Sequence, residues 1–157
     1  MTIDDDIAFF EKVPTLSLLG RGALRILAIG AESRFVHGGE VLFYAGDQAD
    51  SAYVVQEGSF GLRPERPDGE GREVVAGRGS LLGEIAMLTP TMRPATATAL
   101  EPSTVIRISR GLFLKMLEGY PETARRLRDA MAARADQWTR ELDNVRVEME
   151  GKKKRSE

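Results

Sequence analysis

A glycine, a carboxylate and a guanidinium lie close together near the middle of the chain, at Gly83, Glu84 and Arg93. The apolar residues after Glu84 can form one helical turn, which Pro90 would end because proline donates no backbone hydrogen bond. The first amides of such a turn have no partner within it and attract an anion. Arg93 can return to the same place and donate two hydrogen bonds to a phosphate. Glu84 repels an anion, so it is better suited to accept hydrogen bonds from sugar hydroxyl groups.

Short strands are predicted on both sides of this segment, within residues 34–109. Apolar runs of three to five residues alternate there with glycine-rich turns, a pattern typical of a sandwich or barrel. The stretch Arg63–Arg72 carries two prolines and two glycines and is expected to be an exposed hairpin loop. The predicted strands are Val41–Tyr44, Tyr53–Val55, Phe60–Leu62, Val74–Ala76, Thr96–Leu100 and Thr104–Ile108.

Helices are predicted before the strands. Residues 7–30 contain two apolar helical faces, separated by Pro14, which breaks the first helix. The second helix spans roughly Arg21–Ile29 and ends at Gly30, a common helix stop. The acidic start of the chain, which includes Asp4–Asp6, is expected to be solvated.

Helices are also predicted after the strands. Ser109 can cap a helix over Leu112–Glu118, and Pro121 follows its end. A long helix is then expected over Glu122–Glu150, because its apolar residues recur every three or four positions. Those residues are Ala124, Leu127, Met131, Ala135, Trp138, Leu142, Val145 and Met149.

Composition narrows the possible chemistry. The 157 residues are 42% hydrophobic and 29% charged, an ordinary mixture for one globular domain. The net charge of −2 gives no reason to expect non-specific nucleic-acid binding. There are no cysteines and a single histidine, which excludes disulfides, thiolate metal sites and a multi-histidine metal site within the chain. No apolar run reaches the roughly 20 residues of a membrane span, and the acidic N-terminus does not resemble a secretory signal. We therefore expect a cytoplasmic protein with no membrane partner.

The segment from Leu82 to Thr96 resembles the phosphate-binding cassette of cyclic-nucleotide-binding domains, as in catabolite activator proteins and the regulatory subunits of cAMP-dependent protein kinase. That cassette reads Gly-Glu-x-Ala, a spacer, then Arg-x-Ala-Thr. At the same spacing this sequence has Gly83, Glu84, Ala86, Arg93, Ala95 and Thr96. The resemblance covers about residues 7–135. Its other matching positions are Gly39–Phe43, Gly46, Asp47, Tyr53–Val55, Gly58, Phe113, Leu117 and Pro121.

The resemblance implies a mainly β fold: an eight-stranded jelly-roll-like β-roll, or double-stranded β-helix, with N-terminal helices and a long C-terminal helix. It also implies that Arg93 pairs with a cyclic phosphate and Glu84 with the ribose 2′-hydroxyl. The amides of Ile85 and Ala86 would complete the phosphate cradle, and Gly83 would allow the backbone to approach the ligand closely. The full set of expected ligand-binding residues is Gly83, Glu84, Ile85, Ala86, Arg93, Pro94 and Ala95.

Pro94 departs from the family pattern. The residue after the arginine is usually Ala, Ser or Thr, whose amide donates to the phosphate, whereas proline has no N–H. A hydrogen bond to a charged group contributes about 1.5–3 kcal/mol, so its loss would lower affinity about tenfold or more. Pro94 also lacks the hydroxyl that favours guanine, so cAMP is expected in preference to cGMP. Alternatively, the proline marks a pocket adapted to another ligand or a pocket that has lost its ligand.

The domain itself is expected to span residues 1–136, with residues 137–150 extending the C-terminal helix and residues 151–157 forming a basic disordered tail. A helix over Glu122–Glu150 would be roughly 40 Å long, more than this core can cover. Its second half is therefore expected to form a homodimer by parallel pairing, with docking on a regulatory protein as the alternative. The basic run Lys152–Arg155 is expected to be solvated rather than to contact nucleic acid or lipid.

The leading hypothesis is a cyclic-nucleotide sensor that signals by rearrangement of its C-terminal helix, needs no cofactor and is not an enzyme. One alternative is a transcriptional regulator of the catabolite activator type that lacks or has lost its DNA-binding domain; another is a ligand-free scaffold. No nucleophile–base pair or Walker-type loop is present. Two simpler interpretations are also open. Arg93 and Glu84 could form a salt bridge with only a structural role, and His37 is expected to be an ordinary polar surface residue.

Overall fold

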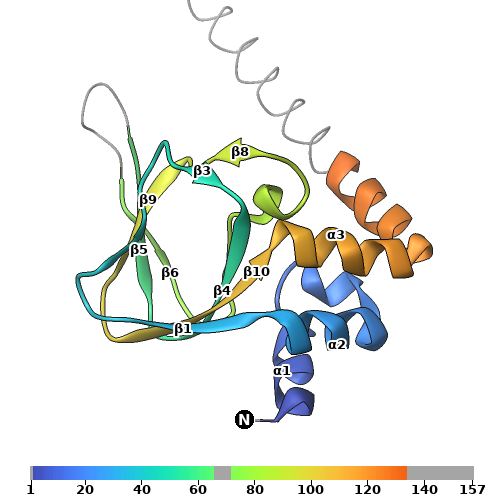
Figure 1. The fold of residues 1–157 in the computed structure, drawn as a ribbon. Coiled ribbons are helices and arrows are strands. Elements are labelled where there is room, and N and C mark those ends of the chain that lie inside the picture. Colours follow the sequence, from blue (N-terminus) through green and yellow to red (C-terminus); the bar gives the residue numbers. More distant parts are fainter. Residues whose placement is uncertain (1, 66–71, 134–157) are drawn as a thin grey trace, which may run out of the picture.

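The computed structural model describes residues 2–65 and 72–133, and these form a β-roll with helices against one side of it (Figure 1). The first four-stranded sheet has the order β1-β10-β4-β7, and the second has the order β2-β9-β5-β6. All strand pairs are antiparallel. A separate two-stranded pair joins β3 to β8. The two four-stranded sheets contain eight strands, as the family resemblance implied, and the fold class is confirmed.

The strands are short, as expected for a β-roll. Their bounds are β1 Glu32–Val36, β2 Val41–Phe43, β3 Gln48–Ala49, β4 Ser51–Glu57, β5 Phe60–Pro64, β6 Val74–Ala76, β7 Leu81–Leu82, β8 Thr91–Met92, β9 Ala95–Ala99 and β10 Ser103–Ser109. All six strands named from the sequence are present, with ends that differ by a few residues at most. Strands β1, β3, β7 and β8 were not among those named from the sequence, because they are two residues long or, in β1, mostly exposed.

The N-terminal segment holds α1 Ile3–Phe10, the short 3₁₀ helix η1 Leu16–Leu18, and α2 Gly20–Gly30. The first helix begins earlier than the sequence indicated. The Thr2 side chain accepts from the amide of Asp5, and the Asp5 carboxylate accepts from the amide of Thr2. Acidic residues in the first turn also interact favourably with the positive end of the helix dipole. The acidic start of the chain is therefore helical as well as solvated.

The C-terminal segment holds α3 Arg110–Gly119 and a further helix that the structure describes over 121–133. As predicted, the Ser109 hydroxyl caps α3 by accepting a hydrogen bond from the amide of Leu112 at 3.1 Å. The predicted continuation to Glu150, the dimerisation surface within it and the basic tail lie outside the described residues.

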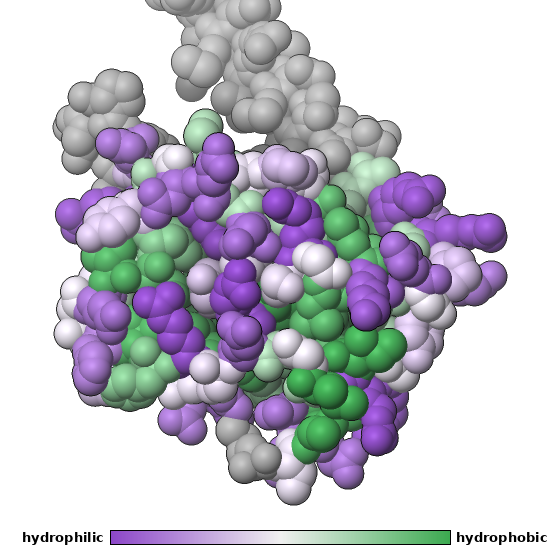
Figure 2. All heavy atoms as spheres, in the orientation of Figure 1, coloured by the Kyte–Doolittle hydropathy of each residue, from purple (hydrophilic) through white to green (hydrophobic). Residues whose placement is uncertain are grey.

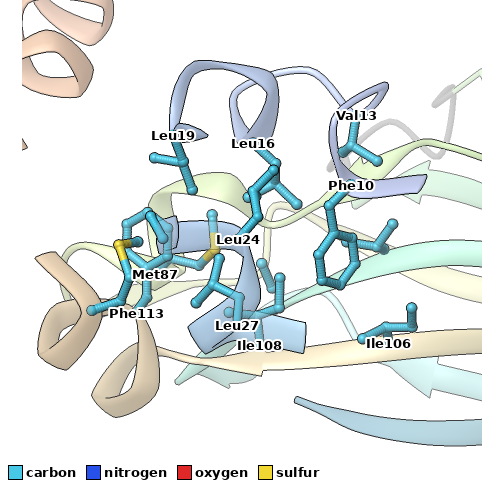
Figure 3. Close-up of a cluster of buried hydrophobic side chains, with 14 of the residues drawn as sticks. Phe10, Val13, Leu16, Leu19, Leu24, Leu27, Met87, Ile106, Ile108 and Phe113 are labelled. Carbon is cyan, nitrogen blue, oxygen red and sulfur yellow. The ribbon is translucent and has the colours of Figure 1, made fainter. Parts of the chain in front are cut away.

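The sheet that contains β4 separates two hydrophobic clusters, because alternate residues of a strand point to opposite faces. Val54, Ile106 and Ile108 face the helices, where they pack with fully buried side chains such as Phe10 and Phe113 (Figure 3). Tyr53 and Val55 face the interior of the β-roll with Phe60, Leu82, Ala97 and Val105. On the surface shown in Figure 2, apolar side chains gather over the β-roll and over the N-terminal helices, with polar side chains between them.

Candidate functional site

The short segment between β7 and β8 contains the predicted helical turn, and it is a 3₁₀ helix, η2, over Glu84–Met87. Gly83 precedes it with φ 79° and ψ 40°, a left-handed conformation that favours glycine. A Cβ at this position would collide with Nη1 of Arg93 and would lie 3.5 Å from the Ser51 carbonyl oxygen. The group that lies closest to Gly83 is thus the Arg93 guanidinium, and the close approach of a ligand to Gly83 stays a prediction.

Two backbone hydrogen bonds place Arg93 at the end of β8. Its amide donates to the Asp47 carbonyl at 2.8 Å, and its own carbonyl accepts from the Gly46 amide at 2.8 Å. The preceding residues of β8 pair with β3, with Met92 opposite Gln48. The Gly46-Asp47 turn, more than forty residues upstream in the sequence, thus holds the arginine backbone against the β-roll.

The side chain of Arg93 is buried, with 5% of its surface exposed. Its guanidinium carbon lies 4.3 Å from the centre of the Phe43 ring and 5.5 Å from the centre of the Tyr53 ring. Nη2 lies 3.4 Å from the Ser51 hydroxyl oxygen. Nη1 is buried and has no hydrogen-bond partner within the described parts of the chain. Because an unpaired buried donor is costly, this atom indicates a place for an acceptor that the described residues do not supply.

The charge on Arg93 is only partly compensated. Burial lowers the pKa of its guanidinium, while the nearby Tyr53, Asp50 and Asp47 oppose that change. Asp50 is linked to it through Ser51, whose hydroxyl donates to the Asp50 carboxylate at 3.0 Å. That hydrogen bond, aided by Arg107, lowers the pKa of Asp50. The alternative ion pair between Arg93 and Glu84 is not among the salt bridges of residues 2–65 and 72–133.

The other residues predicted for the site lie in η2 or directly after Arg93 in the sequence. Glu84 is half-buried, the Ile85 side chain is 57% exposed, Pro94 is exposed and Ala95 is half-buried at the start of β9. The buried Ala86 differs from expectation, because its amide donates to the Gly83 carbonyl at 3.0 Å. That amide already has a partner within the 3₁₀ turn, so in this conformation it is not available to complete a phosphate cradle.

Sequence reasoning missed three residues that contact Arg93, namely Phe43, Ser51 and Tyr53. Phe43 and Tyr53 were noted only as matches to a pattern, and Ser51 was not noted. They come from β2 and β4, which belong to different sheets, and Ser51 is 42 residues from Arg93 in the sequence. The one available signal was alternation along β4: Tyr53 falls between residues that face the helices, so it must face the interior of the roll.

Other features of the described chain bear less on a site. His37 is exposed and its ring meets Phe35 edge-on at 4.7 Å between centres, in line with surface polarity. Among the described residues, no group of three or more His, Asp or Glu side chains is arranged to hold a metal ion. No helix in residues 2–65 or 72–133 is both long enough and apolar enough to cross a membrane.

A β-roll with an arginine buried beneath a glycine-initiated turn defines a class of small-ligand-binding domain, and comparison with known proteins places the chain within it. Residues 33–120 match the model of the cyclic nucleotide-binding domain. The chain belongs to the cyclic nucleotide-binding domain family, as the cassette residues indicated.

Curated relatives carry this domain within much longer chains. Lysophospholipase NTE1 of Chaetomium globosum is 32% identical over 101 residues, 63% of this chain and 7% of its own length. An uncharacterised NTE family protein of Mycobacterium tuberculosis is 33% identical over 122 residues, 78% of this chain and 20% of its own. The chain thus spans a fifth or less of the length of these two relatives.

Solved structures agree with the fold. A cyclic nucleotide-binding-like protein from Brucella abortus is 37% identical, with a TM-score of 0.65 over 73% of this chain and 99% of that one. The catabolite activator protein of Thermus thermophilus is 26% identical, with a TM-score of 0.70 over 84% of this chain and 62% of that one. The regulatory domain of Toxoplasma gondii PKA, crystallised with cAMP, shares the fold at 23% identity and a TM-score of 0.66 over 73% and 44% of the two chains.

Proposed function

We propose that this domain is a regulatory sensor that binds a purine 3′,5′-cyclic nucleotide, with cAMP preferred to cGMP. The observation that carries the proposal is the buried Nη1 atom of Arg93, which has no hydrogen-bond partner in the part of the chain that the structure describes. A cyclic phosphate placed there would accept a charge-assisted hydrogen bond and would compensate a positive charge that burial has stripped of water. Glu84, beside Gly83 at the start of η2, would accept from the ribose 2′-hydroxyl.

The proposed preference for cAMP rests on Pro94. Its side chain has no hydroxyl to offer a guanine, and its nitrogen cannot donate to the phosphate. The phosphate would therefore depend on Arg93 and on amides at the start of η2, of which the Ala86 amide would first have to leave its 3.0 Å bond to Gly83. We expect an affinity in the micromolar range or weaker, because one charged hydrogen bond is absent and a second must be exchanged.

The proposed signal is a change in the C-terminal helix. Within its described part, over 121–133, Leu127 is buried and Met131 packs against the cluster that also contains Phe113 and Met87 of η2. A movement of η2 on ligand binding would therefore change the packing of this helix. A switch of this kind needs only a few kcal/mol of differential affinity between two states. The receiver would be a second copy of the chain or another protein, and the chain itself would act by binding rather than by catalysis.

Isothermal titration calorimetry with cAMP and with cGMP tests the proposal directly. The Arg93→Ala variant is expected to bind cAMP with an affinity at least about thirtyfold weaker, since a charge-assisted contact is lost. Arg25→Ala is a matched control, because Arg25 lies exposed on α2 and should leave affinity unchanged. If the wild-type domain binds neither nucleotide at high micromolar concentration, the sensor proposal fails and the ligand-free scaffold is favoured.

A transcriptional role is the second candidate, and it needs a DNA-binding element that the described residues do not include. A gel-shift with generic duplex DNA at moderate salt is expected to show no retardation, because the net charge of −2 gives little attraction to phosphates. A shift that persists with added salt would instead favour the regulator.

A further inference from the structure

Arg93 is a buried cation, and such groups are rarely tolerated without a carboxylate partner. Within the described residues it has no salt bridge. What it has is a pair of aromatic rings: Phe43 and Tyr53 are stacked with their centres 6.0 Å apart and their planes at 28°. The guanidinium carbon lies within 6 Å of both ring centres, the range in which the negative face of a ring attracts a cation. We call Phe43 and Tyr53 the aromatic shelf.

The shelf bridges the two sheets of the β-roll. Phe43 ends β2 in one sheet, and Tyr53 lies in β4 of the other, where it pairs with Leu82 immediately before Gly83. Tyr53 is therefore tied to the turn that begins η2. The Ser51 hydroxyl accepts from Nη2 and itself donates to Asp50, so this contact restricts rotation of the guanidinium. With the shelf and Ser51 in place, Nη1 is a buried donor that has no partner among the described residues.

We propose that Phe43 and Tyr53 are positioning residues for ligand recognition: the aromatic shelf holds the Arg93 guanidinium in the orientation in which Nη1 is presented to an anion. The shelf stabilises the buried cation, as a carboxylate would, with one difference. A carboxylate would compete with the incoming anion for the same N–H groups, whereas a ring face attracts the cation without occupying its in-plane donors. The proposal rests on the proposed function, because it assumes that the anion is the phosphate of a nucleotide.

The decisive variant is Phe43→Leu, which keeps an apolar side chain in the roll and removes the ring. It should weaken cAMP binding about fivefold to tenfold, while Phe43→Tyr should stay within about twofold of wild type, because only the aromatic face matters. Tyr53→Phe is a second matched control that keeps its ring. To separate positioning from direct contact, Phe43→Leu is repeated in an Arg93→Met background and followed by NMR titration. There it should cause no further loss, since the cation on which the ring acts is absent.

A readout without ligand is the Arg93 Nε–Hε correlation in ¹⁵N-labelled protein, assigned by its loss in Arg93→Met. The Hε signal should lie upfield of those of exposed arginines, and Phe43→Leu should move it toward them. An equal loss of affinity in both backgrounds, or an Hε signal at the position of an exposed arginine in the wild type, would overturn the proposal. If the wild type binds neither cAMP nor cGMP, the proposed function fails, and the Hε position alone decides whether the shelf holds the arginine.

Discussion

The guanidinium carbon of Arg93 lies 4.3 Å from the centre of the Phe43 ring, inside the β-roll and beneath the turn that Gly83 begins. This stacking keeps a charged side chain in a site with 5% exposure, and it leaves one of its nitrogens without a hydrogen-bond partner among residues 2–65 and 72–133. The protein therefore holds a donor and a charge in place that both lack full compensation.

Replacing Arg93 with methionine should stabilise the ligand-free protein while weakening nucleotide binding about thirtyfold or more. Methionine fills a similar volume and packs well against aromatic rings, and it removes a desolvated charge that has no salt bridge within the described residues. The free energy of unfolding in urea should rise by about 1 kcal/mol. At a concentration that raises the thermal midpoint of the wild type, cAMP should raise that of the variant far less. A loss of stability in Arg93→Met would mean that the guanidinium contacts are worth more than its burial costs.

Replacing Gly83 with alanine should cost both stability and binding. The left-handed conformation alone costs an alanine about 1–2 kcal/mol, and the new methyl group would also displace the Arg93 guanidinium. Gly79→Ala separates the two effects, because Gly79 has φ 89° but open space around its Cβ position. We expect Gly79→Ala to lose stability and keep cAMP affinity, and Gly83→Ala to lose both. Equal nucleotide affinity in the two variants would show that Arg93 tolerates a side chain at position 83.

Replacing Pro94 with alanine should tighten nucleotide binding. The change restores a backbone N–H beside the proposed phosphate position, and one hydrogen bond to a charged group corresponds to about tenfold in affinity. Pro94 is exposed, so the substitution should have little effect on folding. Calorimetry on wild type, Pro94→Ala and Pro94→Ser with both nucleotides measures the gain and also tests selectivity, since the serine hydroxyl should improve cGMP binding more than cAMP binding. Unchanged affinity in Pro94→Ala would place the phosphate away from residue 94.

The predicted dimer depends on residues 137–150, which lie outside the described part of the chain. Sedimentation equilibrium of the full chain should report a dimer, and a chain that stops at Asp136 should report a monomer. The physical reason is the apolar stripe at helical spacing that includes Trp138, Leu142 and Val145, which a domain of this size cannot cover by itself. A dimer that survives the truncation would place the interface on the β-roll or on its N-terminal helices.

Local features of the sequence were sufficient to predict much of the fold. The six named strands, the break at Pro14, the helix end at Gly30 and the Ser109 cap all occur as expected, because each depends on residues within one turn or one strand. The early start of α1 was missed although Thr2 and Asp5 form a capping box that the sequence contains. The strand β1 was missed for a different reason. It is an edge strand whose residues are mostly exposed, so it carries no apolar alternation.

The site itself divides along the same line. The cassette residues Gly83, Glu84 and Arg93 lie within one short segment, so their types and spacing were enough to predict a turn and, by resemblance, the family, and both are confirmed. The anion-binding role of Arg93 stays a prediction. Only the tertiary structure decided what surrounds the arginine. Phe43 and Tyr53 come from two different sheets, and Ser51 reaches Arg93 across 42 residues of sequence. Such contacts depend on how antiparallel strands pair and on which face each residue then presents, and no local pattern of residues contains that information.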